Sequence, residues 1–145
     1  MKNSFLFLVI LLIISCSEKS NKTKATSLNK KEEIIENLKK YQNSEQVVDI
    51  LKITYQTIDS IDVKVDTMSY LSKKDKENYK KVRDVTIKDI ETACNDVFLD
   101  LSDYERMKVL KTTEKSISDQ KGMLEYLYRK LSRKNLKGWK QQKEK

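Results

Sequence analysis

The chain has 145 residues and carries 30 Lys and Arg against 22 Asp and Glu, a net charge of +8 at pH 7. It contains no histidine, the residue that most often serves as a general base or a metal ligand, so histidine-dependent catalysis and histidine-based metal sites are excluded. Proline is absent and there are only two glycines, so a chain rich in Lys, Glu, Leu and Ile favours long helices.

The N-terminus has the pattern of a secretory signal peptide. Lys2 precedes ten consecutive apolar residues, 5–14. This run is too short for a bilayer-spanning helix, which needs about 20 apolar residues, but it suits the hydrophobic region of a signal. Polar residues 17–22 follow at once, which argues against a retained membrane helix.

The segment Ile13-Ile14-Ser15-Cys16 resembles the lipobox of bacterial lipoproteins, in which aliphatic residues and a small residue precede a cysteine. The resemblance implies that residues 1–15 are removed and that the sulfur and amino group of Cys16 are acylated. The alternative is an ordinary Cys16 behind a conventional signal, whose cleavage site would prefer a small residue where Ile13 stands. Acylation would hold the protein on a membrane without crossing it.

Residues 16–28 comprise the lipidated cysteine and a predicted flexible tether. The stretch from Ser17 to Leu28 is rich in Ser, Thr, Lys and Asn and shows no apolar period. Fully extended, it spans at most ~40 Å, since each residue adds up to ~3.6 Å. We therefore expect the folded part to stay close to the membrane.

The first helices of the folded part are predicted from capping residues and apolar spacing. Asn29 and Glu32 have capping-box spacing ahead of an apolar set that ends at Tyr41. Asn43 and Ser44 are predicted to interrupt the helix, with Ser44 capping the next, although an unbroken helix remains an alternative. Apolar residues at three- and four-residue steps continue from 47 to 61, and residues 62–71 are predicted to be a connection.

Two further helices are predicted beyond this connection. Ser72 begins the clearest amphipathic helix, whose apolar line includes Ile90 and Cys94, and Ser102 with Glu105 forms a capping box for the next. Ser118-Asp119 or Gly122 is a candidate point at which that last stretch divides into two helices, and one undivided helix is the alternative. The predicted fold class is all-α: a three- to four-helix bundle over residues 29–136, followed by a basic tail, 137–145.

The positive charge is concentrated at the C-terminus. Residues 16–128 contain 21 basic and 21 acidic residues, whereas residues 129–145 contain eight basic residues and Glu144 alone. A helix through this segment would form a cationic stripe beside Trp139, a candidate interfacial anchor. The candidate contacts for an anionic partner are Arg129, Lys130, Arg133, Lys134, Lys137 and Lys140.

Three anionic partners suit these contacts: phospholipid head groups, a sulfated polysaccharide, or nucleic acid. Nucleic acid is the least favoured, because the basic residues lack interleaved aromatic residues for base stacking. The opposing interpretation is a solvated end without a ligand, since charged termini are common and salt screens them.

No catalytic residue, metal site or cofactor is predicted. Cys94 lies on the apolar line of its helix and is expected to be a buried core thiol, with no histidine to activate it. Asp96 and Asp100 are four residues apart, and we expect them on the solvated face of one helix.

The Lys/Asn/Ile-rich composition, together with this signal, resembles the plasmid-borne lipoproteins of Borrelia-type spirochaetes, including their orf-D-like group. That resemblance implies an outer-membrane and possibly surface-displayed protein, without catalytic residues. The sequence therefore predicts a non-catalytic, membrane-anchored binding module for an anionic lipid, a polysaccharide or a host protein. The alternative is a structural or periplasm-facing envelope component with no external ligand.

Overall fold

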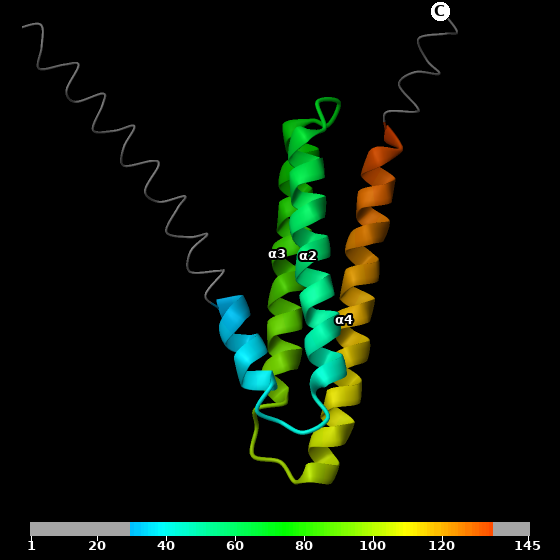
Figure 1. The fold of residues 1–145 in the computed structure, drawn as a ribbon. Helices are drawn as coiled ribbons and strands as arrows, with labels where there is room; N and C mark the ends of the chain where they lie inside the picture. Colours follow the sequence, from blue (N-terminus) through cyan, green and yellow to red (C-terminus); the bar gives the residue numbers. More distant parts are fainter. Residues whose placement is uncertain (1–29, 135–145) are drawn as a thin grey trace, which may run out of the picture.

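The computed structural model describes residues 30–134, which form four α-helices and no strand (Figure 1). The N-terminal helix covers residues 30–38 in its described part. It is followed by α2 (Glu45–Thr67), α3 (Lys73–Asp96) and α4 (Asp103–Ser132). The predicted all-α bundle is confirmed.

The three long helices alternate in direction, with α2 and α4 running one way and α3 the other (Figure 1). α4 packs along both α2 and α3. The N-terminal helix lies across α2 and α3, where Lys31 reaches Asp59 at 3.1 Å and Lys30 reaches Glu91 at 2.5 Å. This arrangement brings the α2–α3 connection and the C-terminal end of α4 to the same end of the bundle.

Apolar packing along the whole bundle provides the core. Each long helix contributes a stripe of buried side chains at three- and four-residue steps, as expected for amphipathic helices that share one core. The buried apolar residues are Ile34, Leu38, Val47, Val48, Leu51, Tyr55, Ile58, Ile61, Val65, Leu71, Tyr79, Ile90, Cys94, Val97, Leu110, Ile117, Leu124 and Leu131.

The predicted helix starts at Ser44, Ser72 and Ser102 are confirmed, and a side-chain cap bond forms at Ser72 and Ser102. The fourth predicted start, at Asn29, lies outside the described residues. Ser72 accepts a hydrogen bond from the Asp75 backbone, and Ser102 forms the complete capping box with Glu105. The break before α2 is also confirmed, and Asn43 adopts a left-handed φ of 60°. Ser44 stands at the N-cap position, but its hydroxyl donates to the Tyr41 carbonyl at 2.8 Å and makes no cap bond.

The prediction of a connection over residues 62–71 was wrong at its start, because α2 continues to Thr67. Val65 is fully buried, whereas Val63 is 66% exposed. Val65 therefore extends the three- and four-residue spacing of Ile58 and Ile61 by one more turn. The alternation of valines at 63 and 65 obscured this helical pattern in the sequence.

Of the two alternatives for the last helix, the structure has the undivided one. α4 is one helix of 30 residues and runs through both Ser118 and Gly122. Neither residue forces a break, because a glycine inside a helix costs only about 1 kcal/mol relative to alanine. Burial of Ile117 and Leu124 on either side more than offsets that cost.

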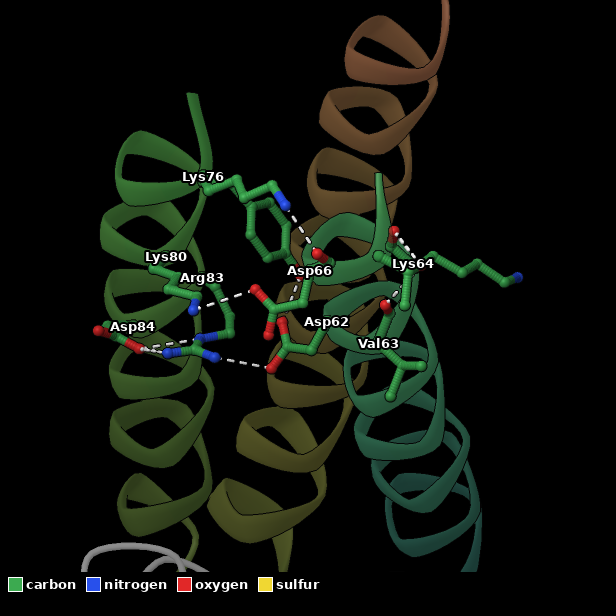
Figure 2. Close-up of polar contacts among 10 residues, drawn as sticks. Asp62, Val63, Lys64, Asp66, Lys76, Lys80, Arg83 and Asp84 are labelled. Atoms are coloured by element: carbon green, nitrogen blue, oxygen red, sulfur yellow. Dashed lines mark hydrogen bonds and ion pairs between the residues drawn. The ribbon is translucent and has the colours of Figure 1, made fainter. Parts of the chain in front are cut away.

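A polar cluster closes the α2–α3 interface toward the α2–α3 connection (Figure 2). The N-terminal helix is about 14 Å long at 1.5 Å per residue, against about 35 Å for α2, so it covers less than half of this interface. Beyond it, the buried Tyr79 hydroxyl donates to Asp62 at 2.6 Å, and Arg83 pairs with the same carboxylate at 2.7 Å. Lys80 pairs with Asp66 at 3.1 Å.

Candidate functional site

The described part of the chain has a basic end and an acidic end. Residues 57–84 and 121–134, around the α2–α3 connection, contain twelve Lys and Arg against seven Asp and Glu. Residues 30–56 and 85–120 contain ten Lys and Arg against thirteen Asp and Glu. We call the first group the basic end. The alternating helix directions produce this separation of charge, since they bring together two segments that are distant in sequence, 57–84 and 121–134.

All seven carboxylates of the basic end lie within ion-pair distance of a cation. Each pairing joins side chains at 3.9 Å or less. The pairs are Asp59 with Lys31, Asp62 and Asp84 with Arg83, Asp66 with Lys80, Asp75 with Lys134, Glu77 with Lys73, and Glu125 with Lys121. The acidic groups of this end are therefore already neutralised from within the bundle.

Seven cations of the basic end have no carboxylate partner among residues 30–134, and one of them, Lys76, donates to the Asp66 backbone carbonyl at 2.6 Å. The other six are exposed. Lys64 lies on α2, and Lys74 and Lys81 lie on α3. The other three, Arg129, Lys130 and Arg133, lie at the C-terminal end of α4. Their charges are available to an anionic partner.

The structure brings together three of the contacts that the sequence predicted. Arg129, Lys130 and Arg133 are exposed on the last turns of α4, and the Arg133 backbone N–H bonds to the Arg129 carbonyl at 3.2 Å. Lys134 differs, because it pairs with Asp75 on α3 at 2.5 Å. This ammonium, followed by the Ser72 hydroxyl, holds the pKa of Asp75 below its usual value. Cys16, Lys137 and Lys140 lie outside the described residues.

The cations on α2 and α3 were not predicted as ligand contacts from the sequence. Lys64, Lys74 and Lys81 lie far from the C-terminus in sequence, in a region whose overall charge is balanced. The signal was nevertheless present, because three long helices joined by short connections must alternate in direction. Such alternation places the segment between α2 and α3 beside the end of α4.

A groove between α2 and α4 adjoins these cations. It has a volume of ≈ 460 Å³, and its lining includes Lys64 and Arg129 together with Gln56, Thr57, Ser60 and Tyr128. The Lys64 ammonium lies 5.7 Å from the centre of the Tyr128 ring, a cation–π arrangement that directs the charge toward α4.

Cys94 does not form a reactive site. The residue is fully buried in α3, and burial raises the pKa of its thiol to about 12. A protonated thiol in apolar surroundings is inert, since the thiolate is the nucleophile. The predicted core position is confirmed.

The acidic pair considered in the sequence does not share a helix. Asp96 is the last residue of α3, and Asp100 lies in the connection to α4, so the prediction of a common helix face was wrong. Among the described residues, no three His, Cys, Asp or Glu side chains are grouped as a metal site would require.

No helix within residues 30–134 has the length and hydropathy needed to span a bilayer. No protein-family model, curated protein or solved structure matches the chain.

Proposed function

We propose that the protein is a lipid-anchored envelope protein, acylated at Cys16, that acts as a non-catalytic binding module. The lipobox-like segment ending at Cys16 supports the anchor. The basic end of the bundle supports the binding role, and its ligand is an anionic surface or polymer. Location at the outer membrane, with display at the cell surface, belongs to the same proposal and rests on the resemblance to spirochaete lipoproteins.

One observation carries the binding role: six exposed cations of the basic end have no carboxylate partner among the described residues, while every carboxylate there is paired. A solvated, ligand-free surface would more commonly intersperse both signs of charge. Here the surplus charge is of one sign, and it lies at the end where the basic residues 135–145 follow in sequence.

The binding role is tested by retention on immobilised heparin in a salt gradient. The protein for this test begins at residue 16 and carries Cys16→Ala, so that no acyl chain contributes, and it retains every buried core residue. The test variant combines Arg129→Gln, Lys130→Gln and Arg133→Gln. The control combines Lys108→Gln, Lys111→Gln and Lys115→Gln, which removes the same charge from the acidic end of α4.

We expect the test variant to elute at clearly lower salt than the control, because the removed charges are those available to a ligand. Equal elution of the two variants would show that net charge alone governs retention. That result would overturn the binding role and favour the structural envelope component.

The anchor is tested separately by labelling cells with radioactive palmitate. Wild type is expected to carry the label and to partition into the detergent phase, whereas Cys16→Ala loses both properties. Labelling that persists in Cys16→Ala would overturn acylation at this residue. Protease treatment of intact cells then reports display: digestion of the bundle supports surface exposure, and full protection places it inside the outer membrane.

A further inference from the structure

The groove between α2 and α4 has the chemistry of a site for a phosphorylated polyol. Two cations, Lys64 and Arg129, line it, and neither has a carboxylate partner among residues 30–134. Glu125, the one carboxylate of the described lining, lies 3.7 Å from Lys121. The groove therefore presents positive charge to a ligand, with its acidic group already compensated.

Polar uncharged side chains continue the lining along α2. Gln56, Thr57 and Ser60 contribute an amide and two hydroxyl groups on successive turns toward Lys64. The Gln56 amide and the Ser60 hydroxyl can both donate to and accept from the hydroxyls of a polyol. The Thr57 hydroxyl donates to the Ile53 carbonyl at 2.8 Å, so it can only accept. The two cations suit a phosphate. The volume of ≈ 460 Å³ falls within the ~300–1,000 Å³ of small-molecule sites.

The surface beside the groove suits a bilayer. Tyr126 is 65% exposed on α4, next to exposed Lys130 and Arg133. Tyrosine, with an apolar ring and a polar tip, is favoured at membrane–water interfaces, and each Lys or Arg near an anionic surface adds to binding. Together, the groove and this surface present one phosphate-binding recess beside an aromatic residue and further cations.

The position of the N-terminal helix allows the basic end to reach the membrane that holds the anchor. Lys31 lies at the level of Asp59, and from there α2 extends only about 12 Å to Thr67 at 1.5 Å per residue. Residues 16–28 supply a chain of up to ~45 Å between Cys16 and the helix. The segment between Cys16 and the N-terminal helix is therefore long enough for the basic end to touch the membrane that holds the acylated Cys16.

From these observations we propose that the α2–α4 groove binds the phosphorylated headgroup of an anionic phospholipid, which docks the basic end on the bilayer. This inference rests on the proposed function and names the ligand of the same basic end. Headgroup phosphate lies between Lys64 and Arg129, and the headgroup hydroxyls meet the polar side chains of α2.

The test measures co-sedimentation with vesicles of phosphatidylcholine that contain phosphatidylglycerol, and with vesicles of phosphatidylcholine alone. The protein again starts at residue 16 with Cys16→Ala. The groove variant is Lys64→Gln with Arg129→Gln. The matched control is Lys74→Gln with Lys81→Gln, which removes two unpartnered cations of the same basic end that do not line the groove.

We expect binding only to the phosphatidylglycerol vesicles. The groove variant is expected to lose clearly more than the ~thirtyfold that two cations near an anionic surface contribute, because Lys64 and Arg129 also hold the headgroup phosphate directly. The control is expected to lose no more than this ~thirtyfold, and circular dichroism spectra check that both variants keep the helical fold. Equal losses in the two variants, or no preference for phosphatidylglycerol, would overturn the inference.

A second arm uses glycerol 1-phosphate, which carries the headgroup chemistry without the bilayer. Weak, saturable competition with the vesicles supports the inference. If glycerol 1-phosphate binds as tightly as the vesicles, the groove is a site for a soluble ligand, and the assignment of a lipid headgroup is overturned. A protein that is retained on heparin but does not bind vesicles would also overturn the assignment of a lipid headgroup, while leaving the proposed function intact.

Discussion

The Tyr79 hydroxyl donates a hydrogen bond of 2.6 Å to the Asp62 carboxylate, although the tyrosine itself is only 1% exposed. This bond lies at the part of the α2–α3 interface that the N-terminal helix leaves uncovered. It satisfies the polar end of a large core side chain and gives Asp62 a second partner beside Arg83. Burial, and then this hydrogen bond, raise the pKa of Tyr79.

Tyr79→Phe is expected to lower the free energy of unfolding by about 1.5 kcal/mol, the lower range for a hydrogen bond to a charged group. The loss stays moderate because Arg83 still pairs with Asp62. Urea unfolding monitored by circular dichroism measures it. Tyr70→Phe is the control, since Tyr70 is 40% exposed, and its midpoint should not move. Equal midpoints for both variants would contradict the role of the bond.

Val65→Ala is expected to destabilise the protein by about 2 kcal/mol, because Val65 is fully buried in the last turns of α2. Val63→Ala removes the same atoms from a residue that is 66% exposed, and should change stability by less than about 0.5 kcal/mol. Urea unfolding of each variant, monitored by circular dichroism, gives the two midpoints whose difference tests this prediction. A larger loss of stability in Val63→Ala than in Val65→Ala would contradict the helical register over residues 62–67.

Gly122→Ala is expected to stabilise the protein by about 0.5–1 kcal/mol. Gly122 lies inside α4, and a Cβ added there meets no atom within 4 Å. Alanine reduces the backbone entropy lost on folding without a steric cost. A raised midpoint of thermal unfolding would confirm the effect, and a lowered midpoint would show that the helix is not continuous at this residue.

Lys134→Met is expected to raise the pKa of Asp75 toward its usual value, because the bond to Lys134 is the main cause of the lowered pKa. A carboxylate with a depressed folded-state pKa adds stability above its unfolded pKa of about 3.9, and this stability is lost as the pH falls through the folded value. Wild type should therefore lose this contribution below about pH 4, whereas the variant has little of it to lose.

NMR titration of the side-chain carboxyl carbons follows this change directly. Glu105 is the internal control, since Ser102 at the other end of the bundle lowers its pKa. Its titration should be the same in both proteins. An unchanged Asp75 titration in Lys134→Met would show that α4 and α3 are not joined at this pair.

The Cys94 thiol should resist alkylation until the protein unfolds. Its pKa of about 12 lies about three units above that of an ordinary cysteine, so the thiolate fraction at pH 8 is about a thousandfold lower. Reaction with a thiol reagent, measured on a Cys16→Ala protein with and without urea, tests this protection. Fast reaction of the folded protein would contradict the burial of Cys94 in α3.

The sequence by itself determined the helical class, the break near Asn43 and the caps at Ser72 and Ser102. These features are local, since capping and apolar periodicity act within one or two turns. It also located the basic residues of α4. The end of α2 was assigned incorrectly, because the alternating valines at 63 and 65 obscured the three- and four-residue spacing that Val65 shares with Ile58 and Ile61.

Tertiary structure alone decided which charges meet. The balanced charge of residues 16–128 does not reveal the basic end, because the alternation of three helices is what puts Lys64, Lys74 and Lys81 at the same end of the bundle as Arg129. The pairing of Lys134 with Asp75, 59 residues apart, likewise separates one candidate contact from the rest. Local sequence fixes what each helix is, whereas packing determines which side chains remain available to a ligand.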